Sequence, residues 1–490
     1  MNFRLLTVLA TLLAAQLISA ADWNRFRGPN GSGVSDATSL PVEFGPETNV
    51  LWKTALPVGH SSPIIVGNRI YLTAAEGGVV TGVDRNKITD KDGTLFTLAI
   101  DRENGEILWK QQAPRPRFER YQPTNSAASP SPAVDGSGVY VFFGDFGLLG
   151  YSLDGAERWR YPLGPFNNVN GHGSSPIVVG NNVVLVCDQD DSGYIIAVNK
   201  NTGKLSWKTD RRETTRTYVT PALFEPATGD PQIIVPSANF IASYSARTGE
   251  KLWWVYDGGW QPKSTPVVDG ERIFVSSWEG GGGRPGDELP TFDEILSQGD
   301  SDRDGRLSAP EIKVVAPRTN FVNTDLDENG FLEERDWTFF RARRSSRSAL
   351  TAIRPDGLGD LTKSGAIAWR LERFLPNSPS PLLYKNVLYL VKDGGIFTAL
   401  DPATGEVLKQ GRLADALDKY YSSPIAADGK IYTIDQTGKA TVVEAGADWK
   451  ILSSNDLAEE VFATPAVTDG RLFIRTRRAL YCFGKKNAGP

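Results

Sequence analysis

The sequence predicts an all-β protein, an eight-bladed β-propeller of four-stranded blades with one small α-helical insertion. Three observations support this prediction. A strand unit recurs at intervals typical of propeller blades, about 40 to 50 residues. The two ends of the repeat array are each incomplete, and each supplies what the other lacks. The chain is also rich in turn residues, with 49 Gly and 31 Pro in 490 residues, and its 40% hydrophobic content is sufficient for a core.

The repeated unit opens with a small residue and a proline, followed by an apolar strand and a glycine turn, as in "SSPIIVGNRIYLT" and "SSPIVVGNNVVLV". The opening prolines are Pro63, Pro132, Pro176, Pro221, Pro266, Pro381, Pro424 and Pro465. Their successive spacings are 69, 44, 45, 45, 115, 43 and 41 residues. Most of these match one blade, so the spacing predicts eight blades, two of them with long excursions.

A tryptophan recurs in the fourth strand of the unit, as in "NGEILWK" and "TGKLSWK". It stands four residues after the turn glycine at Trp109, Trp159, Trp207, Trp253 and Trp369, whereas the sixth unit has Lys409 there. A Trp at the same place in each sheet is typical of packing between neighbouring blades. We therefore expect these residues to be structural and not to contact a ligand.

The ends of the array predict how the ring closes. The eighth unit stops at "LYCFG" after three strands, and "NVLWKTALP", around Trp52, is a fourth strand without the first three. Pairing them would leave no exposed sheet edge. The sequence thus predicts a propeller over residues 49–484, preceded by an N-terminal extension over residues 22–48.

The N-terminus, "MNFRLLTVLATLLAAQLISAADWN", has the basic start, short apolar run and small-residue end of a signal peptide, expected over residues 1–21. We therefore expect a periplasmic or secreted protein, without a transmembrane segment in the mature chain and monomeric. Cys187 and Cys482 both lie in apolar strands, which favours buried free thiols over a disulfide, although export would permit one.

The "TGxxxW" units with proline-opened inner strands resemble the pyrroloquinoline-quinone-like (PQQ-like) propeller repeat family, most closely in "NKNTGKLSW" and "DPATGEVLK". The opening "DWNRFRGPNGSGVSD" is similar to the mature N-terminus of many exported bacterial propellers. The resemblance implies the fold strongly and the chemistry weakly.

The excess length of the fifth unit, residues 280–346, reads as a helical insertion between its second and third strands. Its first loop, residues 300–311, resembles an EF-hand calcium loop, with Gly305 at the sharp turn. The expected ligands are Asp300, Asp302, Asp304, the Arg306 carbonyl, Ser308 and Glu311. Ser308 and Glu311 also have the spacing of a capping box, and Pro310 falls in the first turn of the following helix.

A second loop, residues 325–336, repeats the pattern with Gly330 at the turn. Its expected ligands are Asp325, Asp327, Asn329, the Phe331 carbonyl, Glu333 and Asp336. Asp in place of Glu at the last position predicts weaker binding, because its side chain is one methylene shorter. Leu307 and Leu332 occupy matching apolar positions, so we expect a paired calcium-binding unit with a structural role.

Residues just before each inner strand are expected to converge at one mouth of the central channel. The polar candidates are His60, Asn125, His172, Arg216, Lys263, Asn377 and Tyr420, and Tyr218 and Tyr421 lie in the same connections. A polar cavity with convergent side chains is the default binding-site hypothesis, and a water-filled channel mouth without a ligand is the alternative.

Two functions follow from these features. The first is a non-catalytic, calcium-binding platform for a protein or glycan partner, as in outer-membrane-assembly lipoproteins of similar fold. The alternative is a quinoprotein oxidoreductase with its site at the channel mouth. The chain has no adjacent cysteine pair, no haem motif and no recognisable quinone-calcium ligand set, so we expect no PQQ and assign no catalytic residue. A net charge of −5 and a pI near 5.4 argue against nucleic acid as a partner.

Overall fold

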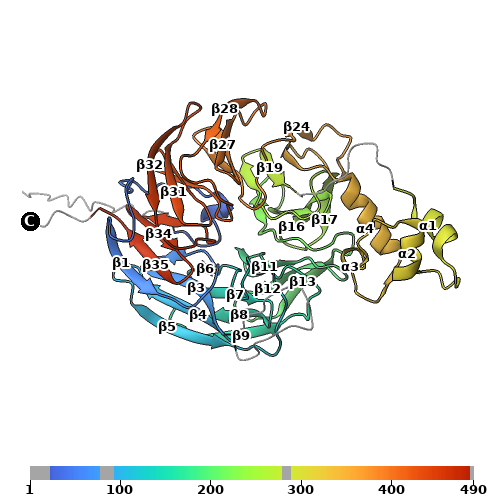
Figure 1. The fold of residues 1–490 in the computed structure, drawn as a ribbon. Coiled ribbons are helices and arrows are strands. Elements are labelled where there is room, and N and C mark those ends of the chain that lie inside the picture. The colour runs from blue at the N-terminus through green and yellow to red at the C-terminus, as the bar shows by residue number, and fades with distance from the viewer. Residues whose placement is uncertain (1–21, 78–92, 279–288, 486–490) are drawn as a thin grey trace, which may run out of the picture.

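The computed structural model describes residues 22–77, 93–278 and 289–485. Eight sheets form blades around a central axis, which confirms the eight-bladed all-β propeller, and few helices are present (Figure 1). The predicted signal peptide, most of the excursion in the first blade and the first part of the fifth-blade insertion lie outside the described residues.

The blades follow one another along the chain, and in blades one to seven the four main strands pair antiparallel in sequence order. Blades one and two contain β2 (Ile64–Val66), β3 (Arg69–Glu76), β4 (Thr94–Asp101), β5 (Ile107–Ala113), β6 (Ala133–Asp135), β7 (Gly138–Phe143), β8 (Gly147–Tyr151) and β9 (Glu157–Pro162). Blades three and four contain β10 (Ile177–Val179), β11 (Asn182–Cys187), β12 (Tyr194–Asn199), β13 (Leu205–Asp210), β14 (Ala222–Phe224), β15 (Gln232–Ser237), β16 (Phe240–Ser245) and β17 (Lys251–Tyr256).

The second half of the ring has the same organisation. Blades five and six contain β18 (Val267–Asp269), β19 (Arg272–Ser277), β22 (Ala349–Ile353), β24 (Ile367–Leu371), β25 (Leu382–Tyr384), β26 (Val387–Lys392), β27 (Ile396–Leu400) and β28 (Val407–Arg412). Blades seven and eight contain β29 (Ile425–Ala427), β30 (Lys430–Ile434), β31 (Lys439–Glu444), β32 (Lys450–Asp456), β33 (Ala466–Thr468), β34 (Arg471–Arg475), β35 (Ala479–Phe483) and β1 (Val50–Ala55).

The closing strand is β1, which pairs antiparallel with β35. Trp52 lies opposite Cys482, and Ala55 lies opposite Ala479. The last blade therefore has the order β1-β35-β34-β33. This confirms the closure predicted from the two incomplete ends and removes a free sheet edge.

The repeated tryptophans join neighbouring blades. The Trp159 indole donates a hydrogen bond of 2.7 Å to the Lys200 carbonyl of the next blade. A Cβ on Gly203, whose φ is +67°, would lie 2.7 Å from Trp159 Cβ, so the turn must carry a glycine. The same indole-to-carbonyl bond links Trp52 to Arg102, Trp109 to Leu153 and Trp369 to Pro402. These contacts support the structural role expected for the tryptophans.

Trp253 departs from this pattern, because the connection between β22 and β24 of blade five contributes a strand to blade four. A short extra strand, β23 (Gly359–Asp360), pairs parallel with β17 and extends blade four to five strands. The Trp253 indole donates to Gln232 of its own blade instead.

A circle of hydrogen bonds connects the inner strands around the axis. The residue before each opening proline is Ser or Thr, and its backbone N–H donates to the hydroxyl of the equivalent residue in the next blade. Seven such bonds of 2.8 to 3.0 Å are present, starting from Ser62, Ser131, Ser175, Thr265, Ser380, Ser423 and Thr464. The innermost strand has no further strand to pair with, so these hydroxyls satisfy its buried N–H groups.

The N-terminal extension crosses the channel beyond this circle, and includes a 3₁₀ turn at Pro29–Gly31. It begins against blades one and two, where Ile65 N–H donates to the Trp23 carbonyl and Val134 N–H to the Asn24 carbonyl. It ends against blade seven, where Ser35 N–H donates to the Ala426 carbonyl. The extension therefore closes the channel at the end away from the mouth.

Eight hydrophobic clusters fill the molecule, seven of them within and between blades. Cys187 and Cys482 are buried free thiols in two different clusters, as expected. None of the described helices has the length and apolar character needed to cross a bilayer.

The eighth cluster belongs to a helical insertion between β19 and β22, beside blades three and four (Figure 1). The insertion contains α1 (Phe292–Gly299), β20 (Leu307–Ser308), α2 (Ala309–Val315), α3 (Phe321–Thr324), β21 (Phe331–Leu332) and α4 (Glu334–Ser345). Leu307 pairs with Leu332 across the two short strands. The insertion thus has a small core of its own, centred on Trp337.

Candidate functional site

The channel mouth forms a cavity of about 350 Å³, here called the mouth cavity. All eight connections that lead into the inner strands contribute to its lining, and Phe26 of the N-terminal extension also lines it. The lining consists of Phe26, His60, Gln122, Thr124, Asn125, Ser129, Asn170, Gly173, Tyr218, Thr220, Lys263, Asn377, Ser378, Ser380, Tyr421, Ser423 and Phe462. The mouth cavity is therefore a cup, open at the mouth and closed below by the extension.

Four of the seven residues proposed for this site from the sequence line the mouth cavity, namely His60, Asn125, Lys263 and Asn377. Lys263 Nζ donates a hydrogen bond of 3.0 Å to Asn377 Oδ1, which joins the connections of blades five and six. His172, Arg216 and Tyr420 do not line it. Their placement at the mouth was wrong, and each has a separate physical reason.

His172 turns into the seam between blades two and three. Its ring meets the rings of Phe142 and Phe166 edge-on, at centroid distances of 5.1 and 4.4 Å. Its Nε2 is buried and has no hydrogen-bond partner among the described residues. Burial lowers the pKa of His172 to about 3, so the imidazole is neutral at physiological pH.

Arg216 and Tyr420 also serve the scaffold. Arg216 is buried against Asp190 and forms an ion pair with it, linking the connection before blade four to blade three. The Tyr420 hydroxyl donates to the Ala416 carbonyl at 2.8 Å, and the side chain is 1% exposed. Its neighbour Tyr421 lines the mouth cavity, because adjacent residues of an extended segment point to opposite sides.

Several lining residues were not among the sequence candidates, in particular Phe26, Gln122 and Phe462. A positional signal identifies eight of the seventeen lining residues: the third residue before each opening proline lines the mouth cavity in all eight units. These residues are His60, Ser129, Gly173, Tyr218, Lys263, Ser378, Tyr421 and Phe462. Phe26 carries no such signal, because it comes from outside the repeats.

The walls combine aromatic faces with amide groups. His60 stacks on Phe462 with ring centroids 4.2 Å apart, and the Tyr421 ring centroid lies 5.3 Å from that of Phe462. Gln122 donates to Asn170 at 2.8 Å, and Asn170 donates to the Tyr218 hydroxyl. Burial, with Arg475 and Arg477 nearby, lowers the pKa of His60 to about 3, so this imidazole is an aromatic and hydrogen-bonding group without charge.

The lining of the mouth cavity does not fit a quinone-calcium centre. Such a centre needs carboxylate oxygens for the ion and a carboxylate base for the substrate. Among the described residues that line the mouth cavity there is no Asp or Glu. The side chains offer amides, hydroxyls, aromatic rings and one ammonium group, a set that suits binding.

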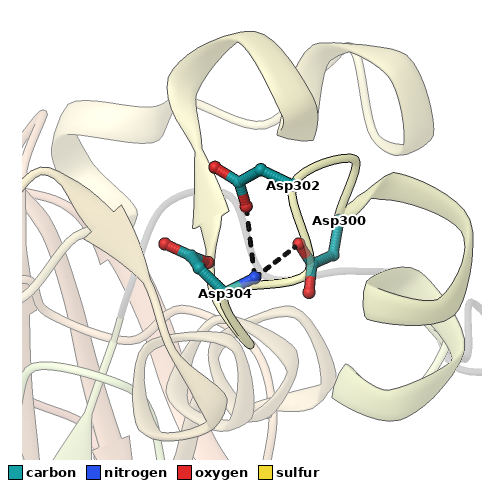
Figure 2. A group of neighbouring side chains, drawn as sticks. All are labelled: Asp300, Asp302 and Asp304. Carbon is teal, nitrogen blue, oxygen red and sulfur yellow. Dashed lines mark hydrogen bonds between the residues drawn. The ribbon is translucent and has the colours of Figure 1, made fainter.

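The insertion carries a second candidate site in its first acidic loop. Carboxylate oxygens of Asp300, Asp302 and Asp304 lie within 4.8 Å of one another (Figure 2). Asp304 N–H donates to Asp300 and Asp302, both at 3.2 Å, which turns their side chains toward one centre. Gly305 has φ +82° and donates to Asp300 at 3.0 Å, and this bond makes the sharp turn.

Glu311 closes the first loop. Its carboxylate accepts hydrogen bonds from the N–H and hydroxyl of both Ser308 and Ser301, at 2.7 to 2.9 Å. These four donors lower the pKa of Glu311 to about 2, so the carboxylate stays ionised. The bonds from Ser308 form the predicted capping box at the start of α2, and Pro310 lies in the first turn of that helix.

The second loop repeats the backbone hydrogen bonds of the first, without the two hydroxyl donors to the last carboxylate. Asn329 N–H donates to Asp325 at 3.1 Å and to Asp327 at 3.2 Å, and Gly330 N–H donates to Asp325 at 3.0 Å. Asp336 accepts from the N–H groups of Leu326 and Glu333, both at 3.0 Å. The Arg306, Ser308, Phe331 and Glu333 positions lie on or beside the paired strands β20 and β21. Both loops therefore present oxygens suited to a hard divalent cation.

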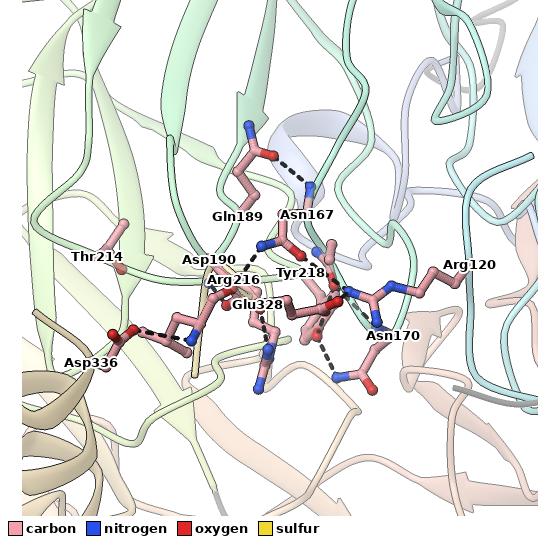
Figure 3. Close-up of polar contacts among 12 residues, drawn as sticks. Arg120, Asn167, Asn170, Gln189, Asp190, Thr214, Arg216, Tyr218, Glu328 and Asp336 are labelled. Carbon is pink, nitrogen blue, oxygen red and sulfur yellow. Dashed lines mark hydrogen bonds and ion pairs between the residues drawn. The ribbon is translucent and has the colours of Figure 1, made fainter. Parts of the chain in front are cut away.

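The second loop also contacts the propeller (Figure 3). Glu328 and Arg120 form an ion pair of 2.5 Å, and Asn167 Nδ2 donates to the Leu326 carbonyl at 2.7 Å. Arg335 donates to the Asp190 carbonyl. Arg120 also donates to Asn167 Oδ1 at 3.1 Å. Asn167 and Asn170 belong to the same connection between blades, and Asn170 lines the mouth cavity. The second acidic loop therefore contacts this connection at a residue only three positions before the cavity lining.

Comparisons with known proteins agree with this architecture. A family model described as outer membrane protein assembly factor BamB matches residues 45–190, 167–282 and 358–487. A curated protein of that name from Alkalilimnicola ehrlichii is 24% identical over 224 residues, which cover 45% of this chain and 50% of the relative. The chain thus spans about half the length of the curated relative it matches.

Solved structures of similar fold include a BamB protein and dehydrogenases. BamB from Moraxella catarrhalis has a TM-score of 0.51 at 12% identity, over 80% of this chain and 94% of that one. A europium-containing methanol dehydrogenase has a TM-score of 0.57 at 10% identity, over 95% and 98%. The quinohemoprotein alcohol dehydrogenase from Comamonas testosteroni has a TM-score of 0.52 at 11% identity, over 96% and 82%. At these identities the structures share the fold alone. The family model covers most of the propeller, and the chain therefore belongs to the family described as outer membrane protein assembly factor BamB.

Proposed function

We propose that this protein is an exported, calcium-binding β-propeller that acts as a non-catalytic binding protein, with a protein partner at the outer membrane. The observation that carries the proposal is the insertion, whose two acidic loops share the same backbone hydrogen bonds and whose second loop lies against the propeller. The name of the relative from Alkalilimnicola ehrlichii supports a role in outer membrane protein assembly. The absence of acids from the described lining of the mouth cavity favours binding over oxidation.

In this proposal the insertion is an EF-hand pair with a structural role. The first loop binds calcium through Asp300, Asp302, Asp304, the Arg306 carbonyl, Ser308 and Glu311. The second binds through Asp325, Asp327, Asn329, the Phe331 carbonyl, Glu333 and Asp336. Exported modules of this kind bind calcium with dissociation constants of about 10⁻⁴ to 10⁻³ M, which suits ambient calcium. The ion holds together carboxylates that would otherwise repel one another.

Calorimetric titration of the chelated, purified chain with calcium tests the metal sites. We expect two sites, the first tighter. Glu311→Gln should weaken the first site by about tenfold or more and Asp336→Asn the second, because each removes a charged ligand. Asp293→Asn is the matched control, because Asp293 is an exposed acid in the first turn of α1, outside both loops. Equal binding by Glu311→Gln and the parent chain would refute the ligand assignment.

The binding role requires a separate test. A tagged full-length chain is cross-linked in cells, purified, and analysed for proteins of the outer-membrane assembly apparatus. Recovery of such proteins, reduced by the chelator, is the expected result. In parallel, the purified protein is assayed for dye reduction with an alcohol, added quinone and calcium. Robust activity that needs both additions would overturn the proposal in favour of a quinoprotein.

A further inference from the structure

The mouth cavity is surrounded by positive charge. Lys263 is the charged residue in its described lining. Arg25 and Arg27 flank Phe26, which forms the floor, and are 5% and 0% exposed. Arg475, 1% exposed, lies behind His60 and donates to Ser61 Oγ at 2.6 Å. A chain with a net charge of −5 thus concentrates four cations at one cavity.

The three arginines are held by neutral oxygens. Arg25 donates to the Pro221 carbonyl at 2.6 Å, Arg27 to the Pro381 carbonyl at 2.7 Å, and Arg475 to the Thr73 carbonyl at 2.8 Å. Among the described residues, none of the three forms an ion pair with a carboxylate, and each retains a buried Nε without an acceptor. Desolvation lowers their pKa values to about 10, about 9 and about 9, which leaves all three charged at neutral pH.

The arginines lie close to the cavity floor. Thr220 and Ser380 line the mouth cavity, and the next residues, Pro221 and Pro381, hold Arg25 and Arg27. Buried charges in a low-dielectric wall act strongly on a solvent-filled cavity, because little water lies between them and its contents. The field in the mouth cavity therefore favours an anion.

The remaining lining favours a ligand with hydroxyl groups. Gln122, Asn170 and Asn377 provide amide donors and acceptors, and serine and threonine hydroxyls lie at the floor. The Asn377 amide accepts from Lys263 through Oδ1, which leaves its Nδ2 without a bond to another described residue. Tyr421 and Phe462 provide apolar faces beside these polar groups. A volume of about 350 Å³ is at the lower end of small-molecule pockets, which limits the ligand to one or two rings.

From this combination we propose that the mouth cavity binds a small hydroxylated carboxylate, a sugar acid. The carboxylate lies toward Lys263 and the floor, and the hydroxyl groups contact the amides of the wall. The ligand is bound and not cleaved, since glycoside hydrolysis uses a pair of carboxylic acids and the described lining contains none. This inference rests on the proposed function in one respect, that the channel mouth is a binding site. It requires neither calcium in the insertion nor a protein partner.

The test is calorimetric titration of the purified full-length chain with galacturonate, with galactose as the neutral analogue. We expect galacturonate to bind at least about tenfold more tightly than galactose, and its affinity to fall with salt. Trigalacturonate distinguishes the sources of the ligand: tighter binding indicates the end of a polysaccharide, and weaker binding a free sugar acid. Either result supports the class, whereas equal binding of galacturonate and galactose, or binding of neither, overturns it.

Two variants locate the ligand. Lys263→Met should lower the affinity for galacturonate by about tenfold or more, because it removes the ammonium in the wall. Asn377→Asp should have the same effect by placing a carboxylate in the cavity, and it preserves size if the first variant folds poorly. Lys450→Met, at an exposed lysine on β32, is the matched control. Unchanged affinity in both mouth variants, or binding of the free quinone without any sugar acid, would overturn the inference. Failure here leaves the calcium titration and the cross-linking result unaffected, so the two proposals are judged separately.

Discussion

Glu328 of the second acidic loop and Arg120 of the connection into blade two form an ion pair of 2.5 Å, although 208 positions separate them in the chain. Arg120 is 9% exposed and also donates to Asn167, which in turn donates to the Leu326 carbonyl of the same loop. The insertion therefore does not simply project from blade five. Its second loop is fastened to connections that lead into blades two and three.

Glu328→Gln should loosen the insertion from the propeller. The amide keeps the size of the side chain but loses the charge-assisted bond to Arg120, a loss of about 1 to 3 kcal/mol. We expect faster proteolysis within residues 289–346 in the presence of calcium, with unchanged calcium affinity at the first loop. Asp293→Asn, at an exposed acid of α1, is the control. A cleavage rate equal to that of the control would show that the ion pair does not hold the insertion.

Chelation should act on the insertion and not on the propeller. Without metal, the acids of the first loop repel one another, and the short helices bury too little to compensate. The propeller has its own hydrophobic clusters and should stay folded. Limited proteolysis with and without chelator should give cuts confined to about residues 280–346 after chelation. Collapse of the whole chain, or equal resistance in both states, would contradict separate stability of the two parts.

Gly203→Ala should destabilise the propeller through the contact between blades. The new Cβ would meet Trp159 and would also sit on a residue with φ +67°, for a combined cost of about 2 to 4 kcal/mol. Gly180→Ala is the matched control, because Gly180 has φ +55° and no atom near the added Cβ, and should cost about 1 kcal/mol. Urea unfolding monitored by tryptophan fluorescence measures both. Similar losses in the two variants would mean that the Trp159 contact contributes nothing measurable.

Removal of residues 22–56 should cause aggregation and not yield a smaller monomer. The deletion exposes the paired edge of β35 and removes Trp23, Leu40 and Phe44 from the hydrophobic cluster that they share with blade eight. Size-exclusion chromatography with light scattering distinguishes the outcomes. A soluble monomer of the truncated chain would show that closure by β1 is dispensable.

His172 should make stability depend on pH. Its pKa is about 3 in the folded protein and about 6.5 in the unfolded chain. Between these pH values His172 binds a proton in the unfolded chain but not in the folded protein. The contribution of His172 to the free energy of unfolding is therefore fully present above about pH 6.5. It falls as the pH drops, by up to about 1.4 kcal/mol per pH unit. His172→Phe should remove this contribution, as measured by urea unfolding at pH 7, 6 and 5. Parallel pH profiles for the two proteins would contradict the assignment.

The repeat, the number of blades and the site of the insertion could be predicted from the sequence because they depend on local signals. An opening proline restricts the residue before it, a positive-φ glycine marks the turn before the fourth strand in six units, and a Trp follows that glycine at one distance in five of them. The incomplete ends also predicted the closing strand, because a fourth strand without partners and a sheet lacking one are complementary. The spacing of acids and glycine predicted both loops, and their internal hydrogen bonds follow that spacing.

Tertiary structure decided which of the candidate side chains line the mouth cavity. Tyr420 and Tyr421 are adjacent tyrosines of one connection, yet the first is bonded to Ala416 and the second faces the cavity. The His172 ring packs between aromatic side chains in the seam between two blades, and Arg216 forms an ion pair with a buried aspartate. Phe26 forms the floor of the cavity, and the flanking Arg25 and Arg27 donate to the carbonyls of Pro221 and Pro381, which precede inner strands far away in the sequence. Such contacts depend on how the ring closes, and the local sequence of the extension does not predict that it will cross the channel.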